Sequence, residues 1–93
     1  MPCRCSRQTA RDLTVMMKQV VREGTGTAAA LQGVEVAGKT GTAELNDAGL
    51  NQPWFICFTP EVAVAVTLER FQGGTGGVDA APIAKAVLQA LGQ

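Results

Sequence analysis

Residues 33–44 read Gly-Val-Glu-Val-Ala-Gly-Lys-Thr-Gly-Thr-Ala-Glu, and this stretch decides how the rest of the chain is interpreted. Its first part has valine at alternate positions, a pattern that is typical of a β-strand. Lys39, Thr40, Gly41 and Thr42 follow and supply one ammonium group, two hydroxyl groups and one residue without a side chain. Such a set can bind an anion through charge-assisted hydrogen bonds. The stretch therefore predicts a β-strand that carries a binding site.

The same stretch also satisfies the pattern of a phosphate-binding P-loop, with Gly33 followed four residues later by Gly-Lys-Thr at residues 38–40. A P-loop requires a strand that ends at the first glycine and a helix that begins at the lysine, because helical N–H groups surround the phosphates. Residues 25–32 do not alternate, and Thr40 is followed by Gly41-Thr42-Ala43 and then by residues 46–49, which are typical of a loop, so no helix begins at the lysine. A P-loop-like nucleotide binder is therefore an alternative whose motif lacks its structural context.

A second template is Lys-Thr-Gly on a β-strand, and the residues on both sides of the tripeptide favour it. Glu-Gly-Thr-Gly-Thr-Ala at residues 23–28 precedes Val-Ala-Gly-Lys-Thr-Gly-Thr-Ala-Glu at residues 36–44, and Trp54 and Phe55 follow. In this order the chain resembles the C-terminal part of the transpeptidase domain of penicillin-binding proteins, most like the class B type, in the serine D,D-transpeptidase and β-lactamase-like superfamily. The resemblance covers nearly all of the chain from Thr9 onward.

The composition excludes several classes of protein. The 93 residues, 46% of them hydrophobic, suffice for one small domain with one core. The formal net charge is zero, and the electrostatic pattern of a nucleic-acid-binding protein is missing. Three cysteines without a Cys-x-x-Cys pair, and no histidine, argue against a metal site, and we expect no cofactor. No apolar run is long enough to cross a bilayer, and residues 1–7 do not resemble a signal peptide.

The N-terminal part of the chain predicts one amphipathic helix. Residues 1–8 show no periodicity and are interpreted as a disordered or non-native start, and by resemblance residues 9–93 are a C-terminal fragment of a transpeptidase domain. Thr9 and Asp12 resemble a capping box at the start of a helix with recurring apolar residues. Gly24 is a suitable residue to end that helix.

Two glycine-containing segments connect the remaining elements. Residues 25–32 predict a turn and a short helical piece, and by resemblance Thr25 and Thr27 help to shape one end of the substrate groove. Residues 73–77 are mostly glycine and predict a flexible connector. The last helix is expected to start within residues 79–82, where a proline is tolerated in the first turn.

Three strands are expected between the helices. The first spans residues 34–44. Residues 53–59 are almost continuously apolar, which predicts a central strand covered on both faces, with Cys57 acting as a small buried hydrophobic residue. Residues 62–69 place valines on one face and alanines on the other, and the alanine face could admit a helix at close range.

The expected fold class is α+β, with a helix, a three-stranded antiparallel sheet and a C-terminal helix. The resemblance implies a partial β-lactamase or transpeptidase-like fold that lacks the N-terminal strands and the helical subdomain. The strand at residues 62–69 would then keep an open edge, which favours self-association or pairing with the missing part of the domain.

The alternation along the first strand places Lys39 and Gly41 on one face and Thr40 and Thr42 on the other. A single ligand can meet both sets only if it lies along the edge of that strand, so we expect this strand at the edge of the sheet. An extended peptide could add there as one more strand.

The resemblance implies a role for each residue of this site. In the family, a serine attacks the carbonyl group of a peptidoglycan stem peptide ending in D-alanyl-D-alanine, or of a β-lactam. Lys39 would supply positive charge near the substrate carboxylate, and Thr40 would donate a hydrogen bond to it. Gly41 would leave room for the ligand, and the backbone N–H of Thr42 would form half of an oxyanion hole.

The nucleophile of that reaction is missing from the sequence. The only serine is Ser6, and the third residue after it is Thr9, so the chain contains no Ser-x-x-Lys motif, and it contains no Ser-x-Asn motif either. We therefore expect no catalytic residue in this chain and no acyl transfer by it alone. It would act in cell-wall cross-linking only together with the missing serine-bearing part.

Two further expectations complete the interpretation. By resemblance, the full-length protein would work at the extracytoplasmic face of the bacterial inner membrane. The alternative to a transpeptidase fragment, besides the nucleotide binder, is a non-catalytic module that binds peptides along the edge of the Lys39 strand.

Overall fold

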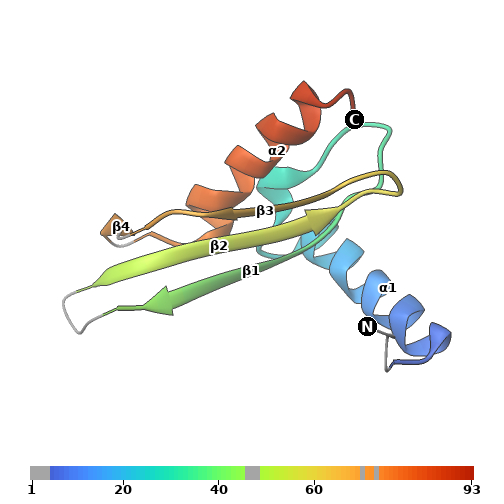
Figure 1. Ribbon diagram of the computed structural model, residues 1–93, viewed down its shortest axis with the longest axis horizontal. Helices are drawn as coiled ribbons and strands as arrows, with labels where there is room; N and C mark the ends of the chain where they lie inside the picture. Colours follow the sequence, from blue (N-terminus) through green and yellow to red (C-terminus); the bar gives the residue numbers. More distant parts are fainter. Residues whose placement is uncertain (1–4, 46–48, 70, 73) are drawn as a thin grey trace.

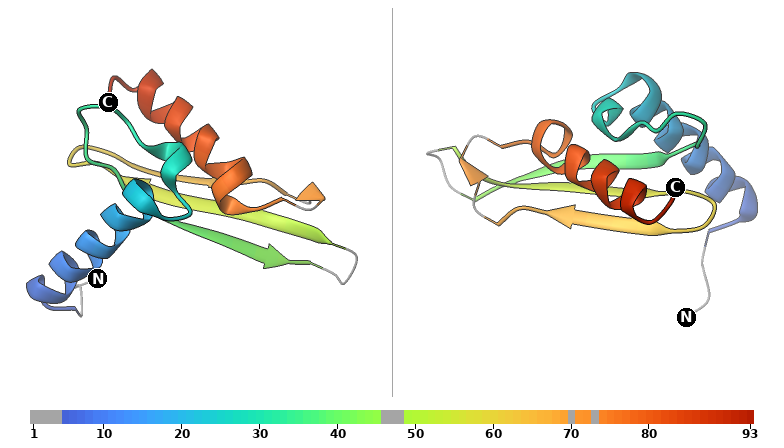
Figure 2. Two further views of the ribbon diagram at one scale, coloured as in Figure 1. Left: turned by 180° about the vertical axis from the view of Figure 1, so that it is seen from behind. Right: turned by 90° about the horizontal axis from the view of Figure 1, so that it is seen from above.

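The computed structural model describes residues 5–45, 49–69, 71–72 and 74–93. An antiparallel sheet forms one layer; α2 and the C-terminal end of α1 pack on one face of it, and the N-terminal half of α1 projects beyond the sheet (Figures 1 and 2). This arrangement confirms the predicted α+β class and order of elements. In chain order the elements are α1 (Arg7–Glu23), η1 (Thr27–Ala29), β1 (Ala37–Glu44), β2 (Leu50–Phe58), β3 (Ala63–Thr67), β4 (Phe71–Gln72), η2 (Gly76–Ala80) and α2 (Ala81–Ala90).

The strand order is β1–β2–β3, so β1 lies at an edge of the sheet, as its two-sided polar pattern predicts. The short strand β4 pairs antiparallel with the first residues of β2, on the side away from β1. β1 begins at Ala37, three residues after the expected start, because Val34 instead forms an isolated bridge with Leu31.

One face of β2 is open, which corrects the prediction of a strand covered on both faces. Phe55 and Cys57 are buried under the helices, whereas Trp54 and Ile56, on the opposite face, keep 40% and 45% of their surface exposed. The prediction that this apolar run forms the central strand is confirmed, because β2 lies between β1 and β3. The described part of this chain provides a helical layer for only one of them.

The helices pack on the valine side of β3, and not on its alanine side as predicted. Val66 is buried in the core, whereas Ala63 and Ala65 are exposed. The physical reason lies in α2, because Ala81 and Ala84 of this helix are fully buried against the sheet. The small residues that allow close packing are therefore on the helix, and the larger ones are on the strand.

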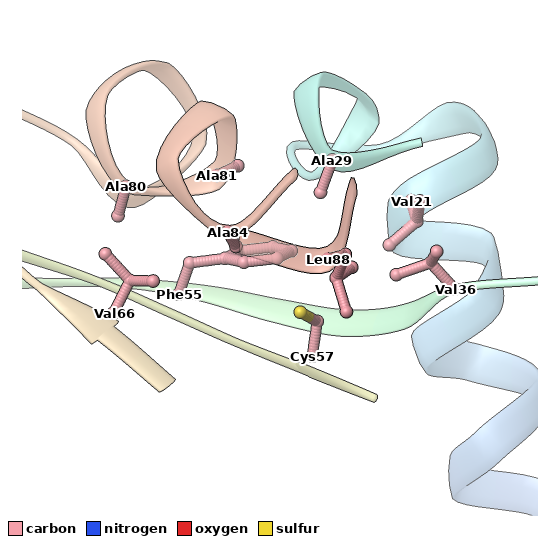
Figure 3. Close-up of a cluster of buried hydrophobic side chains, with 10 residues drawn as sticks. All are labelled: Val21, Ala29, Val36, Phe55, Cys57, Val66, Ala80, Ala81, Ala84 and Leu88. Carbon is pink, nitrogen blue, oxygen red and sulfur yellow. The ribbon is translucent and has the colours of Figure 1, made fainter. Parts of the chain in front are cut away.

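The core lies between α2, the end of α1 and the inner face of the sheet (Figure 3). Phe55 and Leu88 are among its largest fully buried side chains. Cys57 belongs to the same cluster, which confirms its predicted role as a small hydrophobic residue, and burial raises the pKa of its thiol. The cluster consists of Val21, Ala29, Val36, Phe55, Cys57, Val66, Ala80, Ala81, Ala84 and Leu88.

The first helix starts earlier than predicted. Ser6, and not Thr9, is its N-cap, and the Ser6 hydroxyl accepts a hydrogen bond of 3.0 Å from the backbone N–H of Thr9. Arg7 and Gln8 are therefore helical, whereas residues 1–4 lie outside the described residues. Among the helices that the structure describes, none combines the length and apolarity needed to cross a membrane.

The last helical segment also starts earlier than predicted, at Gly76, so residues 76–77 are not a flexible connector; residue 73 lies outside the described residues. The Thr75 hydroxyl accepts a hydrogen bond from the N–H of Val78, and the Asp79 carboxylate accepts one of 2.8 Å from the N–H of Thr75. This reciprocal pair resembles a capping box, but the returning side chain is an aspartate four residues after the cap, where the usual motif has a glutamate three residues after it.

An ion-pair cluster joins α1 to the segment before β1. The carboxylate of Glu35 contacts the ammonium group of Lys18 and the guanidinium group of Arg22. The hydrogen bond from Lys18, together with the charges of Lys18 and Arg22, lowers the pKa of Glu35. The cluster therefore links the last turns of α1 to the segment that leads into β1.

Replacing Leu88 with alanine should lower the free energy of unfolding by about 2–5 kcal/mol, because the substitution leaves a cavity in the core. Leu88 is fully buried, whereas Leu91, three residues later, is 56% exposed. The matched substitution Leu91→Ala should change stability by less than about 0.5 kcal/mol. Chemical denaturation measures both, and equal effects of the two substitutions would contradict the observed core.

The carboxyl group of Glu35 should titrate below its usual range in a carbon-detected NMR titration. A carboxylate whose pKa is lowered by folding stabilises the protein above its unfolded pKa, and this contribution is lost as the pH falls through the folded pKa. Lys18→Gln should raise the pKa of Glu35, whereas Lys85→Gln on α2 should leave it unchanged. A pKa that does not respond to Lys18→Gln would show that the ion pair is not formed in solution.

Candidate functional site

The register of the sheet places the candidate residues on two faces of β1. Thr40 pairs with Phe55, which is buried under the helices, so Thr40 and Thr42 face the helical layer. Lys39 pairs with Ile56 on the open face, and Gly41 lies on that face too. The structure therefore brings the two threonines together on one side of the strand and leaves Lys39 on the other.

The backbone of β1 also has two sides. The N–H of Leu45 donates a hydrogen bond of 2.8 Å to the carbonyl oxygen of Leu50, in continuation of the β1–β2 register. Because bonded and non-bonded pairs alternate in an antiparallel ladder, Thr40 and Thr42 direct their N–H and C=O groups away from β2. The ammonium group of Lys39 donates a hydrogen bond to the carbonyl oxygen of Thr40. The open edge of the sheet therefore presents backbone groups of both threonines.

A third threonine, which precedes η1, contacts this strand. The hydroxyl oxygen of Thr25 lies 2.7 Å from the hydroxyl oxygen of Thr40, within hydrogen-bonding distance. On the other side of Gly41, the hydroxyl oxygen of Thr42 accepts a hydrogen bond of 3.3 Å from the N–H of Gly76. The threonine side of β1 is thus tied to the segment after α1 and to the start of η2.

A hollow of about 440 Å³ opens among these segments. Thr40 and Thr42 line this hollow together with Thr25 and Thr27, whereas Lys39 does not. Threonines and glycines dominate the lining, which consists of Gly24, Thr25, Thr27, Thr40, Thr42, Thr75, Gly76, Gly77 and Val78.

The first residues of η2 line the hollow, although the glycine-rich pattern of residues 73–77 predicts a flexible connector. A Cβ atom on Gly76 would lie 2.1 Å from the carbonyl oxygen of Trp54 and 2.8 Å from the backbone nitrogen of Gly41. A Cβ atom on Gly77 would lie 2.3 Å from the carbonyl oxygen of Thr25. Both glycines therefore permit a close approach of backbones. The signal in the sequence was a pair of glycines directly after a helix-capping threonine.

Among the described residues, neither a serine nor a cysteine side chain lies at the site. Ser6 caps the far end of α1, and a 17-residue helix separates it by about 25 Å from Gly24, which lines the hollow. Cys57 is buried in the core, and the raised pKa of its thiol opposes formation of a thiolate. The lining of the hollow therefore brings together hydroxyl and backbone groups from three segments.

The P-loop alternative does not fit the observed geometry. Lys39 and Thr40 lie inside β1, and the strand continues to Glu44. A P-loop needs a helix that begins at its lysine, because the helical N–H groups hold the phosphates. Residues 33–40 therefore do not form a phosphate-binding loop.

Comparison with known proteins identifies the family. The family model described as "Penicillin binding protein transpeptidase domain" matches residues 4–89. The peptidoglycan D,D-transpeptidase PbpA of Mycolicibacterium smegmatis is 42% identical over 94 aligned positions, which cover 88% of this chain and 18% of that protein. Penicillin-binding protein 1A/1B of Bacillus subtilis is 41% identical over 71 positions, which cover 66% of this chain and 8% of that protein.

Solved structures agree with this result. The D,D-transpeptidase domain of a peptidoglycan glycosyltransferase from Eggerthella lenta matches with a TM-score of 0.73 and 40% identity, over 94% of this chain and 21% of that one. The transpeptidase domain of the FtsI4 D,D-transpeptidase from Legionella pneumophila matches with a TM-score of 0.71 and 30% identity, over 95% of this chain and 37% of that one. The chain thus spans well under half of each of these relatives. It belongs to the family of penicillin-binding protein transpeptidase domains.

Proposed function

We propose that this chain forms the Lys-Thr-Gly wall of a transpeptidase active-site groove and acts in peptidoglycan cross-linking together with a serine-bearing part. The observation that carries this proposal is the edge of β1, where two threonine hydroxyls lie on one face and the backbone groups of the same threonines point outward. The ligand would be the terminal D-alanyl-D-alanine of a stem peptide, or a β-lactam.

Each residue of the wall has a separate task in this proposal. The hydroxyl of Thr40 donates a hydrogen bond to the ligand carboxylate, and Lys39 supplies positive charge from the opposite face of the strand. A hydrogen bond to a charged group is stronger than one between neutral groups. The N–H of Thr42, at the open edge, is one donor of an oxyanion hole, and the missing part of the domain would supply the other components.

The surroundings of Gly41 support a ligand on this strand. A Cβ atom on Gly41 would find only the Cβ of Trp54, at 3.8 Å, which is ordinary van der Waals contact. The packing of the fold therefore does not require glycine at this position, in contrast to Gly76. A ligand that lies along the edge of β1 explains why the side chain is missing there.

The open face of the sheet supports the need for a partner. Trp54 and Ile56 are exposed on this face, and Ile56 lines a shallow hollow together with Met17 of α1. Large exposed apolar patches mark interaction surfaces. Since the chain spans only 18% of the PbpA relative, we infer that the remainder of a transpeptidase domain covers this face and brings the serine nucleophile. In the same proposal, the full-length protein works at the extracytoplasmic face of the bacterial inner membrane.

A non-catalytic peptide-binding module is the second candidate function. The outward-pointing backbone groups of Thr40 and Thr42 favour it, because an extended peptide can pair with such an edge without any covalent step. The two candidates differ in one outcome. A transpeptidase wall gains covalent penicillin labelling when the serine-bearing part is present, whereas a binding module does not.

A peptide that ends in D-alanyl-D-alanine should shift the backbone amide resonances of residues 39–42 in an NMR titration. The same peptide with an amidated C-terminus should cause much smaller shifts, because it lacks the carboxylate that Thr40 and Lys39 attract. Equal responses to both peptides would argue against a carboxylate site at this edge.

Gly41→Ala should leave the free energy of unfolding within about 0.5 kcal/mol of the wild-type value, since the new methyl group makes no close contact. It should weaken binding of the carboxylate-terminated peptide by roughly fivefold or more, because an added methyl group in a packed contact typically costs about 1–3 kcal/mol. Gly76→Ala, in contrast, should destabilise the fold. If Gly41→Ala folds and binds the peptide as tightly as the wild-type protein does, the ligand does not lie along this strand.

The chain alone should not be labelled by a fluorescent penicillin, because its described residues offer no accessible nucleophile next to the site. Addition of the serine-bearing part of a relative's transpeptidase domain should give a labelled species, and Lys39→Ala should reduce the labelling. If the two parts associate and remain unlabelled, the non-catalytic peptide-binding function is favoured.

A further inference from the structure

We propose that Thr25 is a positioning residue of this site, whose hydroxyl group holds the Thr40 hydroxyl in the orientation that donates to an anionic ligand. This inference rests on the proposed function, because it concerns the hydroxyl that would meet the ligand carboxylate. Its basis is the distance of 2.7 Å between the two hydroxyl oxygens, which come from segments 15 residues apart.

The chemistry of the two groups gives the contact a direction. A hydroxyl group donates one hydrogen bond and accepts up to two, whereas a carboxylate only accepts. When Thr40 donates its single proton to a carboxylate, Thr25 can remain bonded to Thr40 only by donating to it. The two hydroxyls and the ligand then form a chain in which each hydrogen bond polarises the next.

Thr25 can position its neighbour because its own segment is held on several sides. The N–H groups of Gly24 and Gly26 both donate to the carbonyl oxygen of Val20, at 3.1 and 3.0 Å, and fix the end of α1. Gly26 is buried, and a Cβ atom on it would lie 3.1 Å from the ring of Phe55. On the other side of Thr25, the backbone of Gly77 lies close to the carbonyl oxygen of Thr25. The hydroxyl of Thr25 is therefore presented from a segment with little room to move.

The contact also restricts the side chain of Thr40. Thr40 is only partly buried on an edge strand, where a threonine side chain can otherwise exchange between rotamers. The bond to Thr25 selects the rotamer that directs the hydroxyl into the hollow of about 440 Å³, which both threonines line. Removal of the Thr25 hydroxyl should therefore release the Thr40 side chain without changing the strand itself.

Thr25→Val tests this inference, because valine has nearly the shape of threonine and lacks the hydroxyl. The variant should bind a peptide ending in D-alanyl-D-alanine roughly threefold to tenfold more weakly, which is the range for one neutral hydrogen bond. Thr25→Ser keeps the hydroxyl and should restore most of the affinity. Thr14→Val on α1 removes a different hydroxyl, which donates to the carbonyl oxygen of Ala10, and should leave peptide affinity unchanged.

A second measurement does not depend on binding. Three-bond NMR couplings of Thr40 should report one side-chain rotamer in the wild-type and Thr25→Ser proteins and averaging in Thr25→Val. If the wild-type protein binds peptide and Thr25→Val binds it equally well, the inference is overturned, whatever the couplings show. If the wild-type protein binds no peptide, the proposed function fails and the couplings alone decide whether Thr25 positions Thr40.

Discussion

The arrangement of the site depends on the packing of one aromatic ring. Phe55 is fully buried, and its ring lies so close to β1 that a Cβ atom on Gly38 would come within 2.6 Å of it. The same ring approaches Gly26 in the segment after α1. Thr40 pairs with Phe55 in the sheet, and Thr25 directly precedes Gly26, so the ring packs against both segments that carry the two threonines. The hydroxyl contact between Thr25 and Thr40 lies beside this ring.

Glycines at the site serve two different physical purposes. Gly38, Gly76 and Gly77 are required by the fold, because a side chain on any of them would overlap atoms already in place. Gly41 meets no such obstacle, and the space next to it opens toward the uncovered face and the free edge of β1. Internal packing therefore accounts for the first three, whereas the absence of a side chain at Gly41 is consistent with access to the strand from outside.

The uneven covering of the sheet fits a chain that matches one part of a larger domain. One face is closed by η2 and α2, where Ala80 lies over Val66 and Ala84 lies over Phe55 (Figure 3). The other face leaves Trp54 and Ile56 exposed. A near-continuous apolar run such as that of β2 is typical of strands that are buried on both faces.

The sequence by itself determined what depends on local periodicity and backbone geometry: the order of the elements, the central position of β2, and the division of Lys39 and Thr40 between two faces of an edge strand. It even identified the family, because the residues around Lys39 are contiguous. Only the tertiary structure decided which face of the sheet the helices cover, and that Thr25 and Gly76 meet the same strand. These contacts join residues 15 and 34 positions apart. The first lies beside the ring of Phe55, and the second depends on the close approach of Gly76 to the backbone of Trp54 and Gly41. No local pattern in the sequence encodes either packing contact.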